Sequence, residues 1–426
     1  MVKRRPAFCL GPFLTLAVLT FFLHACGSGA SGPDSGNVVD SGSDVAMDAG
    51  HDLPQADLPP SDSIDASAAD VPADAPVDGE TPDSGDIIAG PDDSSDPIDS
   101  SVVDLNEDDS DVADPACPVF DDPVVLSNME GTVLTELSGL AASRIHEGVL
   151  WAHNDSGDSA RIFAVVPDPS QSSGPPLITP FAFDSEGQTW GCFDWEDIAV
   201  GPFGPEGASH IFVADSGGNG CKDRTSYRLF IVAEPPVLAE GSISEVTVVT
   251  YVYPDGPHDC EAVFVDPVDG SVYFVVKEER IKTSGVYRLS AQDLAEAGTD
   301  PVTATLVATI PGQLVTGADM SEDGRMLVIR NYGGQKILDT LCGGLLFERG
   351  DGESVADMLG GTFCLLPDFS GEPWIEIQGE AIAISSDGAG LLTAPEYILG
   401  GFVPQLLRFW PFSHADRSRP GPFSRR

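Results

Sequence analysis

The chain has 426 residues, of which 42% are hydrophobic, and it carries a formal net charge of −47 at pH 7. A protein that neutralises phosphates needs clustered Lys and Arg, so this acidic balance argues against nucleic acid as a partner. Beyond the N-terminal segment, no stretch approaches the ~20 apolar residues that a membrane-spanning helix needs.

Segment 1–25 has the layout of a secretory signal. Basic residues precede an apolar run of about a dozen residues and a small residue before Cys26. The letters LHAC, ending at Cys26, resemble the bacterial lipobox, which directs lipid such as palmitate to the thiol, although His24 is unusual at its place. The alternative is an ordinary signal peptide with a cysteine near the cut. We therefore predict a lipoprotein of the cell envelope; because Gly27 and not an aspartate follows Cys26, the resemblance implies the outer membrane or cell surface.

Segment 26–116 is predicted to be a disordered tether. Asp, Ser, Pro, Ala and Gly dominate it from Gly27 onward, and it holds no Lys or Arg. Such a composition cannot bury enough apolar surface to fold. An unstructured chain of this length reaches about 50 Å, and repulsion between its carboxylates extends it further. Its aspartates lack the fixed spacing of a calcium-binding loop.

The cysteines predict disulfide bonds. Of the eight in the chain, Cys9 leaves with the signal and Cys26 would carry lipid. The remaining even number, in an oxidising compartment, predicts three disulfides whose connectivity stays open. Cys342 with Cys364 is the best single pair, because two strands of one sheet would bring them together. No Cys/His spacing typical of structural zinc is present.

Segment 117–413 repeats one short phrase. The phrase recurs about every 60 residues, as a sheet-per-repeat array requires, in the forms LSGLAAS, WEDIAVG, CEAVFVD, TGADMSED and QGEAIAIS. Each is followed by short β-branched or aromatic runs that Gly, Pro, Asp or Ser turns separate. Four strands per repeat without amphipathic helices are typical of a β-propeller. We therefore predict an all-β fold with five four-stranded blades.

The two ends of this segment predict how the ring closes. The last repeat has only three strands, but PVVLSNM precedes the first phrase as an outer strand would. The N-terminal strand is therefore expected to complete the last blade, which leaves no sheet edge open. A sixth blade stays open as an alternative within the longer fourth repeat, LLFERGDGESVADMLGGTFCLLP. Segment 414–426 is expected to be a basic disordered tail.

Several motifs carry a family resemblance: SGLAAS, HNDSGD, DWEDIAVGP, ADSGGN, CEAVFVDP, TGADMS, RNY and QGEAIA. With them, segment 117–413 resembles a group of secreted bacterial β-propeller proteins and, more loosely, the SdiA-regulated and esterase-like phytase propellers. The resemblance implies the propeller fold across the whole folded segment. It implies little about chemistry.

In a propeller, the loop that enters the innermost strand and the loop between the second and third strands open on the same face. Two sets of polar residues are therefore expected to meet at one mouth. The loops entering the inner strands carry Glu196, Asp197, Glu261, Asp319 and Glu380. The second-to-third turns carry His153, Asn154, Asp155, Asp215, Asn219, Lys277, Arg330, Tyr332 and Glu396.

The oxygen-rich members of these sets predict a Ca²⁺ site, because carboxylate and amide oxygens suit a hard cation. The candidate metal ligands are Asn154, Asp155, Asp158, Asp197, Glu261 and Glu380. The candidate ligand-binding residues are His153, Asp215, Asn219, Lys277, Arg330, Tyr332 and Glu396, with Arg330 suited to bidentate contact with a phosphate or carboxylate.

Two structural alternatives accompany the site. The HNDSGD turn also folds on its own side-chain hydrogen bonds without a metal. The acids that recur in every blade, Glu196, Glu261 and Glu380, are also expected if they accept backbone hydrogen bonds from the neighbouring blade and tie the sheets together.

The leading functional hypothesis is a binding or interaction module for a protein, glycan or small molecule, monomeric and held off the membrane by its lipid anchor. The alternative is an exported metal-dependent phosphoester or ester hydrolase, with a metal-bound water as nucleophile and His153 or Glu261 as general base. No Gly-x-Ser-x-Gly elbow, P-loop or dinucleotide motif appears. Asymmetry at the mouth is expected to separate these hypotheses. An enzyme should have a metal or a base with a shifted pKa in one sector, whereas a binding module should have an apolar or aromatic patch on its rim.

Overall fold

The structure is a computed structural model, and it describes residues 117–155, 157–168, 170, 174–184, 194–218, 224–277, 283–312, 314–332, 343–369, 376, 378–397 and 404–413. Cys26, the predicted tether and the basic tail lie outside these residues. No helix in the described part is long and apolar enough to cross a membrane.

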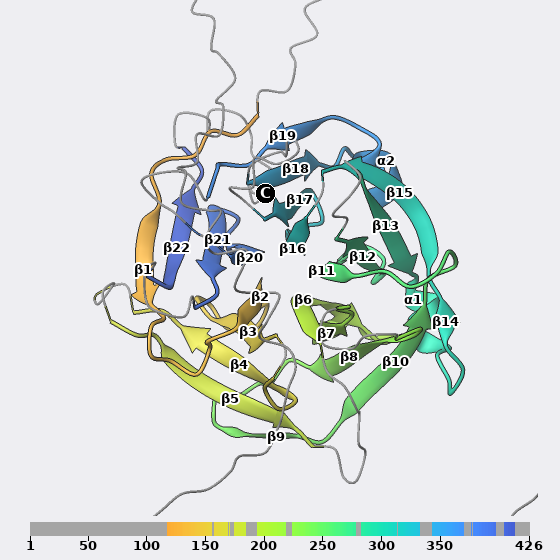
Figure 1. The fold of residues 1–426 in the computed structure, drawn as a ribbon, viewed down its shortest axis with the longest axis horizontal. Helices are drawn as coiled ribbons and strands as arrows, with labels where there is room; N and C mark the ends of the chain where they lie inside the picture. The colour runs from red at the N-terminus through yellow and green to blue at the C-terminus, as the bar shows by residue number, and fades with distance from the viewer. Residues whose placement is uncertain are drawn as a thin grey trace, which may run out of the picture. The chain divides into compact units, whose positions relative to one another are not determined.

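Five small sheets form a ring, each running from an inner strand outward (Figure 1). Blade 1 contains β2 (Leu137–Ala142), β3 (Leu150–Asn154), β4 (Arg161–Val166) and β5 (Leu177–Phe183). Blade 2 contains β6 (Trp195–Phe203), β7 (Ala208–Asp215), β8 (Tyr227–Ala233) and β10 (Val246–Val252). Blade 3 contains β11 (Cys260–Val265), β12 (Val272–Val276), β13 (Thr283–Leu289) and β15 (Thr305–Pro311).

Blade 4 contains β16 (Val315–Met320), β17 (Met326–Asn331), β18 (Gly344–Glu348) and β19 (Phe363–Leu365). Blade 5 contains β20 (Gly379–Ile384), β21 (Gly390–Pro395), β22 (Leu406–Pro411) and β1 (Val124–Asn128). The five-bladed propeller predicted from the repeat is thus confirmed. The long fourth repeat holds helix α2 (Val355–Leu359) before β19, and no sixth sheet appears among its described residues.

The N-terminal strand closes the ring as predicted. Strand β1 pairs antiparallel with β22, and Phe120 forms an isolated bridge with Phe412 just beyond the paired strands. Every inner strand then contacts the inner strands of both neighbouring blades. The first and last segments of the propeller therefore hold each other in one sheet.

Two short strands tie neighbouring blades at their outer edges, and the sequence patterns did not indicate them. Strand β9 (Gly241–Ile243) leaves blade 2 and pairs parallel with β5 of blade 1. Strand β14 (Val302–Thr303) leaves blade 3 and pairs parallel with β10 of blade 2. Helix α1 (Ala291–Ala295), which follows β13, starts with a capping box between Ser290 and Asp293.

The repeated phrase encodes a β-bulge near the start of every inner strand. A bulge displaces one residue from the ladder and re-aims its side chain. The displaced positions are polar in all five blades and are occupied by Ser138, Glu196, Glu261, Thr316 and Glu380. These residues are buried, so each bulge places a buried polar side chain near the start of an inner strand.

The hydrophobic core lies between the blades. Inner strands such as β2 and β11 are buried along their whole length because each blade is covered on both faces. Trp151, Trp195 and Trp410 lie in this core. The indole N–H of Trp151 donates to Glu234 at 2.8 Å, which satisfies its only polar atom.

The predicted pairing of Cys342 with Cys364 is wrong, because Cys364 forms its disulfide with Cys117. The two cysteines are 247 residues apart in the chain. Their approach depends on ring closure, which carries the N-terminal segment past the outer strand of blade 4. Cys192, Cys221 and Cys342 lie outside the described residues.

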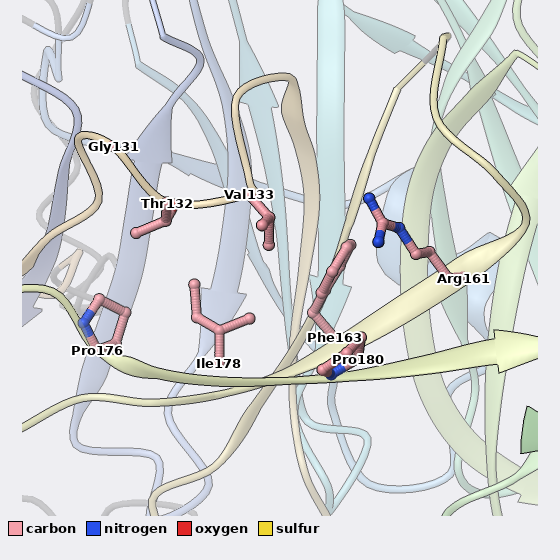
Figure 2. Close-up of a pocket in the computed structure, with 8 residues that line it drawn as sticks. All are labelled: Gly131, Thr132, Val133, Arg161, Phe163, Pro176, Ile178 and Pro180. Atoms are coloured by element: carbon pink, nitrogen blue, oxygen red, sulfur yellow. The ribbon is translucent and has the colours of Figure 1, made fainter. Parts of the chain in front are cut away.

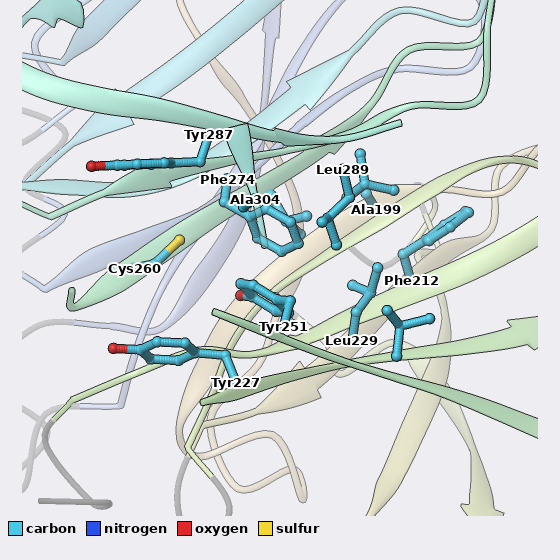
Figure 3. Packing of buried hydrophobic residues seen from close by; sticks show 14 of the residues in the cluster. Ala199, Phe212, Tyr227, Leu229, Tyr251, Cys260, Phe274, Tyr287, Leu289 and Ala304 are labelled. Atoms are coloured by element: carbon cyan, nitrogen blue, oxygen red, sulfur yellow. The ribbon is translucent and has the colours of Figure 1, made fainter. Parts of the chain in front are cut away.

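Cys260 is a free, fully buried thiol, so the six cysteines do not form three disulfides. It lies among aromatic side chains between blades 2 and 3, including Tyr227, Tyr251 and Tyr287 (Figure 3). Burial raises the pKa of the Cys260 thiol to about 12. Its role is therefore that of a small apolar core residue.

Candidate functional site

One backbone hydrogen bond recurs in every blade and aligns the loops of one face. The residue after the second strand donates its N–H to the carbonyl of the residue two positions before the bulge. The pairs are Asp155 to Glu136 at 2.8 Å, Ser216 to Asp194 at 3.2 Å, Lys277 to Asp259 at 2.8 Å, Tyr332 to Leu314 at 2.7 Å and Glu396 to Gln378 at 3.0 Å. The two sets of loops therefore meet on one face, as predicted.

We define the mouth by three equivalent positions in each blade. The entry positions are Glu136, Asp194, Asp259, Leu314 and Gln378. The bulge positions are Ser138, Glu196, Glu261, Thr316 and Glu380. The turn positions are Asp155, Ser216, Lys277, Tyr332 and Glu396.

The mouth is asymmetric. Its entry positions are acidic in blades 1 to 3, but they are Leu314 and Gln378 in blades 4 and 5. Both of these residues have a positive φ, 55° and 52°, which side-chain-bearing residues rarely adopt and which costs conformational energy. The mouth therefore has an acidic sector over blades 1 to 3 and a sector over blades 4 and 5 that includes Leu314 and the phenol ring of Tyr332.

Two overlapping groups of carboxylates occupy the acidic sector. One consists of Asp155, Asp194 and Glu196; the other consists of Glu196, Asp259 and Glu261. Within each group, one oxygen of every carboxylate lies within 4.8 Å of the others, a spacing on which a hard cation can be held. Asp155 and Glu261 were predicted as metal ligands. Asp194 and Asp259 were missed, because nothing in the sequence marks the residue that precedes an inner strand.

Glu196 is common to both groups. Glu196 is only 3% exposed, and no described residue donates a hydrogen bond to its carboxylate. Burial, followed by the nearby carboxylates Glu261, Asp155 and Asp194, raises its pKa well above the usual value. A buried carboxylate without a donor is costly unless it binds a proton or a cation.

The turn beside Glu196 leaves room for this carboxylate only because it contains glycine. A Cβ atom built on Gly217 would lie 1.8 Å from Glu196 Oε1 and 2.6 Å from Asp194 Oδ2. The glycine pair in the ADSGGN motif was the available sequence signal, since close approach of backbone to a site requires glycine.

Lys277 pairs with Glu261, a member of the second group. Its Nζ donates to both carboxylate oxygens of Glu261 at 2.5 Å, and it lies 5.5 Å from the ring centroid of Tyr332. Burial acts to lower the pKa of Lys277, but the charges of Glu261, Glu380 and Glu196 outweigh it and raise the pKa well above its usual value. The side chain is therefore an ammonium ion.

The remaining predicted mouth acids, Glu380 and Glu396, come from blade 5. Glu380 is buried, and Glu396 accepts a hydrogen bond of 3.4 Å from the amide of Gln378. Burial raises the pKa of both glutamates, and repulsion from Glu380 adds to the shift of Glu396. Neither belongs to the two carboxylate groups.

The HNDSGD turn does not bring its three predicted ligands together. The Asn154 amide accepts a hydrogen bond from Glu136 N at 3.1 Å and donates to Asp158 Oδ2 at 2.8 Å. Asp158 also forms an ion pair with Arg161 at 2.8 Å. Partial burial tends to raise the pKa of Asp158, but hydrogen bonds from Arg161 and Asn154 lower it. Asn154 and Asp158 therefore hold the turn together by hydrogen bonds and an ion pair, as the structural alternative predicted. Of the three predicted ligands, only Asp155 belongs to a carboxylate group of the mouth.

Asp215 is a support for the site and does not line it. It is fully buried and forms ion pairs with Arg224, at 2.9 Å, and with Arg228. Its Oδ1 also accepts a hydrogen bond of 2.9 Å from the backbone N–H of Asp194. Asp215 thus orients the entry loop of blade 2, and Asn219, predicted nearby, lies outside the described residues.

His153 lies below the mouth, between blades 1 and 2. Its ring meets Trp195 edge to face at 5.9 Å, and its Nδ1 bonds to the carbonyl of Asn154 at 2.8 Å. Complete burial lowers its pKa to about 4. The prediction that His153 lines the mouth is wrong, because this histidine is the fourth residue of strand β3, which is buried along its whole length.

The carboxylates that accept backbone N–H groups from the inner strands of neighbouring blades belong to aspartates, and not to the recurring glutamates. Asp197 Oδ2 accepts hydrogen bonds from Val263 N at 2.8 Å and Ala318 N at 3.1 Å, so one carboxylate joins the inner strands of blades 2, 3 and 4. Asp319 Oδ2 accepts one from Ile384 N at 2.7 Å, which joins blades 4 and 5. Asp197 is therefore not a metal ligand, and burial raises its pKa well above the usual value.

Arg330 is likewise occupied within the fold. Its guanidinium donates to the Ala381 carbonyl at 2.7 Å and to Glu376 Oε2 at 2.7 Å. Glu376 also accepts from Arg408 at 2.8 Å and from the Thr393 hydroxyl at 2.8 Å. The prediction that Arg330 contacts a ligand phosphate is therefore wrong, because its guanidinium is held in the buried Arg330–Glu376–Arg408 triad.

A separate hollow of about 270 Å³ lies beside blade 1 (Figure 2). It is bounded by the loop after β1 and by strands β4 and β5. Arg161 is its only charged lining residue and is already paired with Asp158. The hollow therefore offers no group for the predicted chemistry.

No protein-family model matches the chain, and no curated protein matches it. Similar solved structures include the Dos1 propeller, with 10% identity over 65% of this chain and 68% of that chain and a TM-score of 0.30. A Penicillium chrysogenum α-L-arabinanase complexed with arabinobiose has 10% identity over 69% and 99% of the two chains and a TM-score of 0.37. The calcium structure of a Trichoderma reesei enzyme of carbohydrate-active family AA12 has 9% identity over 70% and 97%, also with a TM-score of 0.37.

Similarities this weak carry nothing about activity. The fold therefore rests on the five sheets of the structure, and the resemblance to SdiA-regulated and phytase-like propellers stays a prediction. What is shown of this chain is a five-bladed β-propeller with an asymmetric acidic mouth.

Proposed function

We propose that the chain is a calcium-binding interaction module, a propeller whose mouth binds Ca²⁺ and whose N-terminal tether holds it at the cell envelope. The single observation that carries the calcium assignment is Glu196. Its carboxylate is buried, lies in both carboxylate groups and receives no hydrogen bond from the described residues. A hard divalent cation ligated by carboxylate oxygens would remove the cost of burying this charge.

The sector of blades 4 and 5 supports a binding role. Leu314 and Tyr332 are each partly exposed, and the Tyr332 ring lies 5.5 Å from the Nζ of Lys277, which pairs with Glu261. They would contact a ligand that the cation also holds. The hydrolase alternative has weaker support. Its two predicted bases are His153, which is buried away from the mouth, and Glu261, whose oxygens both accept from Lys277.

Glu196→Gln is expected to weaken Ca²⁺ binding by at least about tenfold, or about 1.4 kcal/mol, because both groups lose a charged ligand. Isothermal titration calorimetry of the full chain measures this. In EDTA the same variant is expected to melt at a higher temperature than the wild type, because it removes a buried charge that has no donor.

Glu396→Gln is the matched control, since it removes a mouth carboxylate that lies outside both groups. It is expected to keep the calcium affinity within a factor of a few. Weak binding by the acidic tether is common to all variants and cancels in the comparison. Equal affinities for the Glu196→Gln variant and the wild type would reject the calcium site.

The envelope assignment rests on the LHAC sequence ending at Cys26 and on the tether that follows. Bacteria expressing the full chain are expected to incorporate an alkyne-labelled palmitate into it, and Cys26→Ser is expected to abolish the label and release the protein from the membrane fraction. An unlabelled wild-type chain would favour the ordinary signal peptide.

A further inference from the structure

Lys277 is the one basic side chain among the residues that define the mouth. It comes from the turn after β12, with its side chain 14% exposed. Both oxygens of Glu261 accept hydrogen bonds from its Nζ at 2.5 Å, and the ring of Tyr332 lies 5.5 Å away. The ammonium is therefore held in place from two sides.

The two carboxylate groups differ in their relation to this ammonium. Glu261 belongs to the group with Glu196 and Asp259, so a metal ion bound there would share Glu261 with Lys277. The group of Asp155, Asp194 and Glu196 makes no ion pair with Lys277. The two groups share Glu196, whose buried carboxylate receives no hydrogen bond from the described residues and so itself points to a bound cation.

Charge repulsion then limits how many ions the mouth holds. Like charges a few ångströms apart repel more strongly in a poorly solvated site than in water. A divalent ion at Glu196, Asp259 and Glu261 would lie close to the ammonium that Glu261 already binds. An ion at Asp155, Asp194 and Glu196 would be farther from it, across the shared carboxylate.

Resting on the proposed calcium function, we infer that Lys277 is a built-in counter-ion that takes the place of a second divalent cation. The wild-type mouth then binds one Ca²⁺, at Asp155, Asp194 and Glu196, and Lys277 sets both this stoichiometry and the affinity. The shared Glu196 joins the metal ion to the protein's own cation.

The test is Lys277→Met, which keeps an unbranched side chain one atom shorter and removes the charge. Calorimetry with Ca²⁺ on the full chain is expected to show one tight site in the wild type and two in the variant. The first ion is also expected to bind at least about tenfold tighter in the variant, because the neighbouring positive charge is absent. Lys277→Arg, which keeps the charge, is expected to retain one site.

Two controls separate this effect from a general change in charge. Arg325→Met removes one positive charge from an exposed pair with Asp351 and is expected to bind calcium like the wild type. The double variant Lys277→Met with Glu261→Gln removes both members of the buried pair. It is expected to return to a single site, because the second group then lacks one of its three carboxylates.

The outcomes distinguish this inference from the proposed function. One tight site in both the wild type and Lys277→Met, with equal affinity, would overturn the counter-ion role while leaving the calcium site standing. No binding in the wild type but one ion in Lys277→Met would reject the proposed function and support the counter-ion role, whereas no tight binding in either rejects both. If Lys277→Met is unfolded in EDTA, refolding on addition of millimolar Ca²⁺ supports the inference, and failure to refold overturns it.

Discussion

Glu376→Ala is expected to lower the free energy of unfolding by about 3–5 kcal/mol, because it leaves two guanidinium groups buried without their shared carboxylate. Glu376 accepts hydrogen bonds from Arg330 at 2.7 Å and from Arg408 at 2.8 Å, and the three side chains are 0%, 2% and 5% exposed. Urea unfolding of the variant and the wild type, at equal ionic strength, measures the difference.

Two comparisons make this prediction specific to the buried triad. Asp351→Ala, which breaks the exposed pair with Arg325, is expected to cost less than about 1 kcal/mol. Replacing the whole triad by apolar residues, Glu376→Leu with Arg330→Met and Arg408→Met, is expected to recover most of the loss, because no unpaired charge stays buried. A Glu376→Ala variant as stable as the wild type would mean that the triad is solvated in solution.

Asp197→Ala is expected to lower the free energy of unfolding by about 4 kcal/mol, which is the second large effect. The substitution leaves the N–H groups of Val263 and Ala318 buried without an acceptor, and each such group costs about 1–3 kcal/mol. The inner strands of blades 2, 3 and 4 also lose their common contact. Urea unfolding again measures the effect.

Asp197→Asn is the matched variant. Its single carbonyl oxygen can accept from Val263 and Ala318, but its NH₂ group then faces the N–H of Ile198, which now donates to Asp197 Oδ1 at 2.8 Å. We expect about half the loss seen with alanine. A cost below 1 kcal/mol for Asp197→Ala would contradict the role of this carboxylate as the tie at the propeller axis.

Adjacent acids on strand β6 thus have different roles, with consequences for function. Asp197 points to the axis and holds three blades together, whereas Glu196 is displaced by the bulge toward the carboxylates of the mouth. The equivalents of Asp197 in the other blades are small, Gly139, Ala262, Gly317 and Ala381, which leaves space at the axis for one side chain. Asp197 therefore joins three blades through one carboxylate, while Asp319 joins blades 4 and 5.

The sequence determined the architecture of this protein. The repeated phrase, the four strand-forming runs that follow it and the strand before the first phrase predicted five blades and closure by the N-terminal strand, and the structure confirms them. These features are readable because strand alternation, turn residues and the repeat spacing are local properties of the chain. The same alignment also placed Asp155, Glu261 and Lys277 on one face.

Only the tertiary structure decided which of these residues meet. The carboxylate groups combine side chains from three blades, and which acid joins them depends on a one-residue bulge that sends Glu196 to the mouth and Asp197 to the axis. Arg330 is buried against Glu376, which comes from the segment between blades 4 and 5, and the Cys117–Cys364 disulfide joins segments that only ring closure brings together. Residue type and spacing carry no record of such long-range contacts, because they arise from packing between blades and not from any property of one strand.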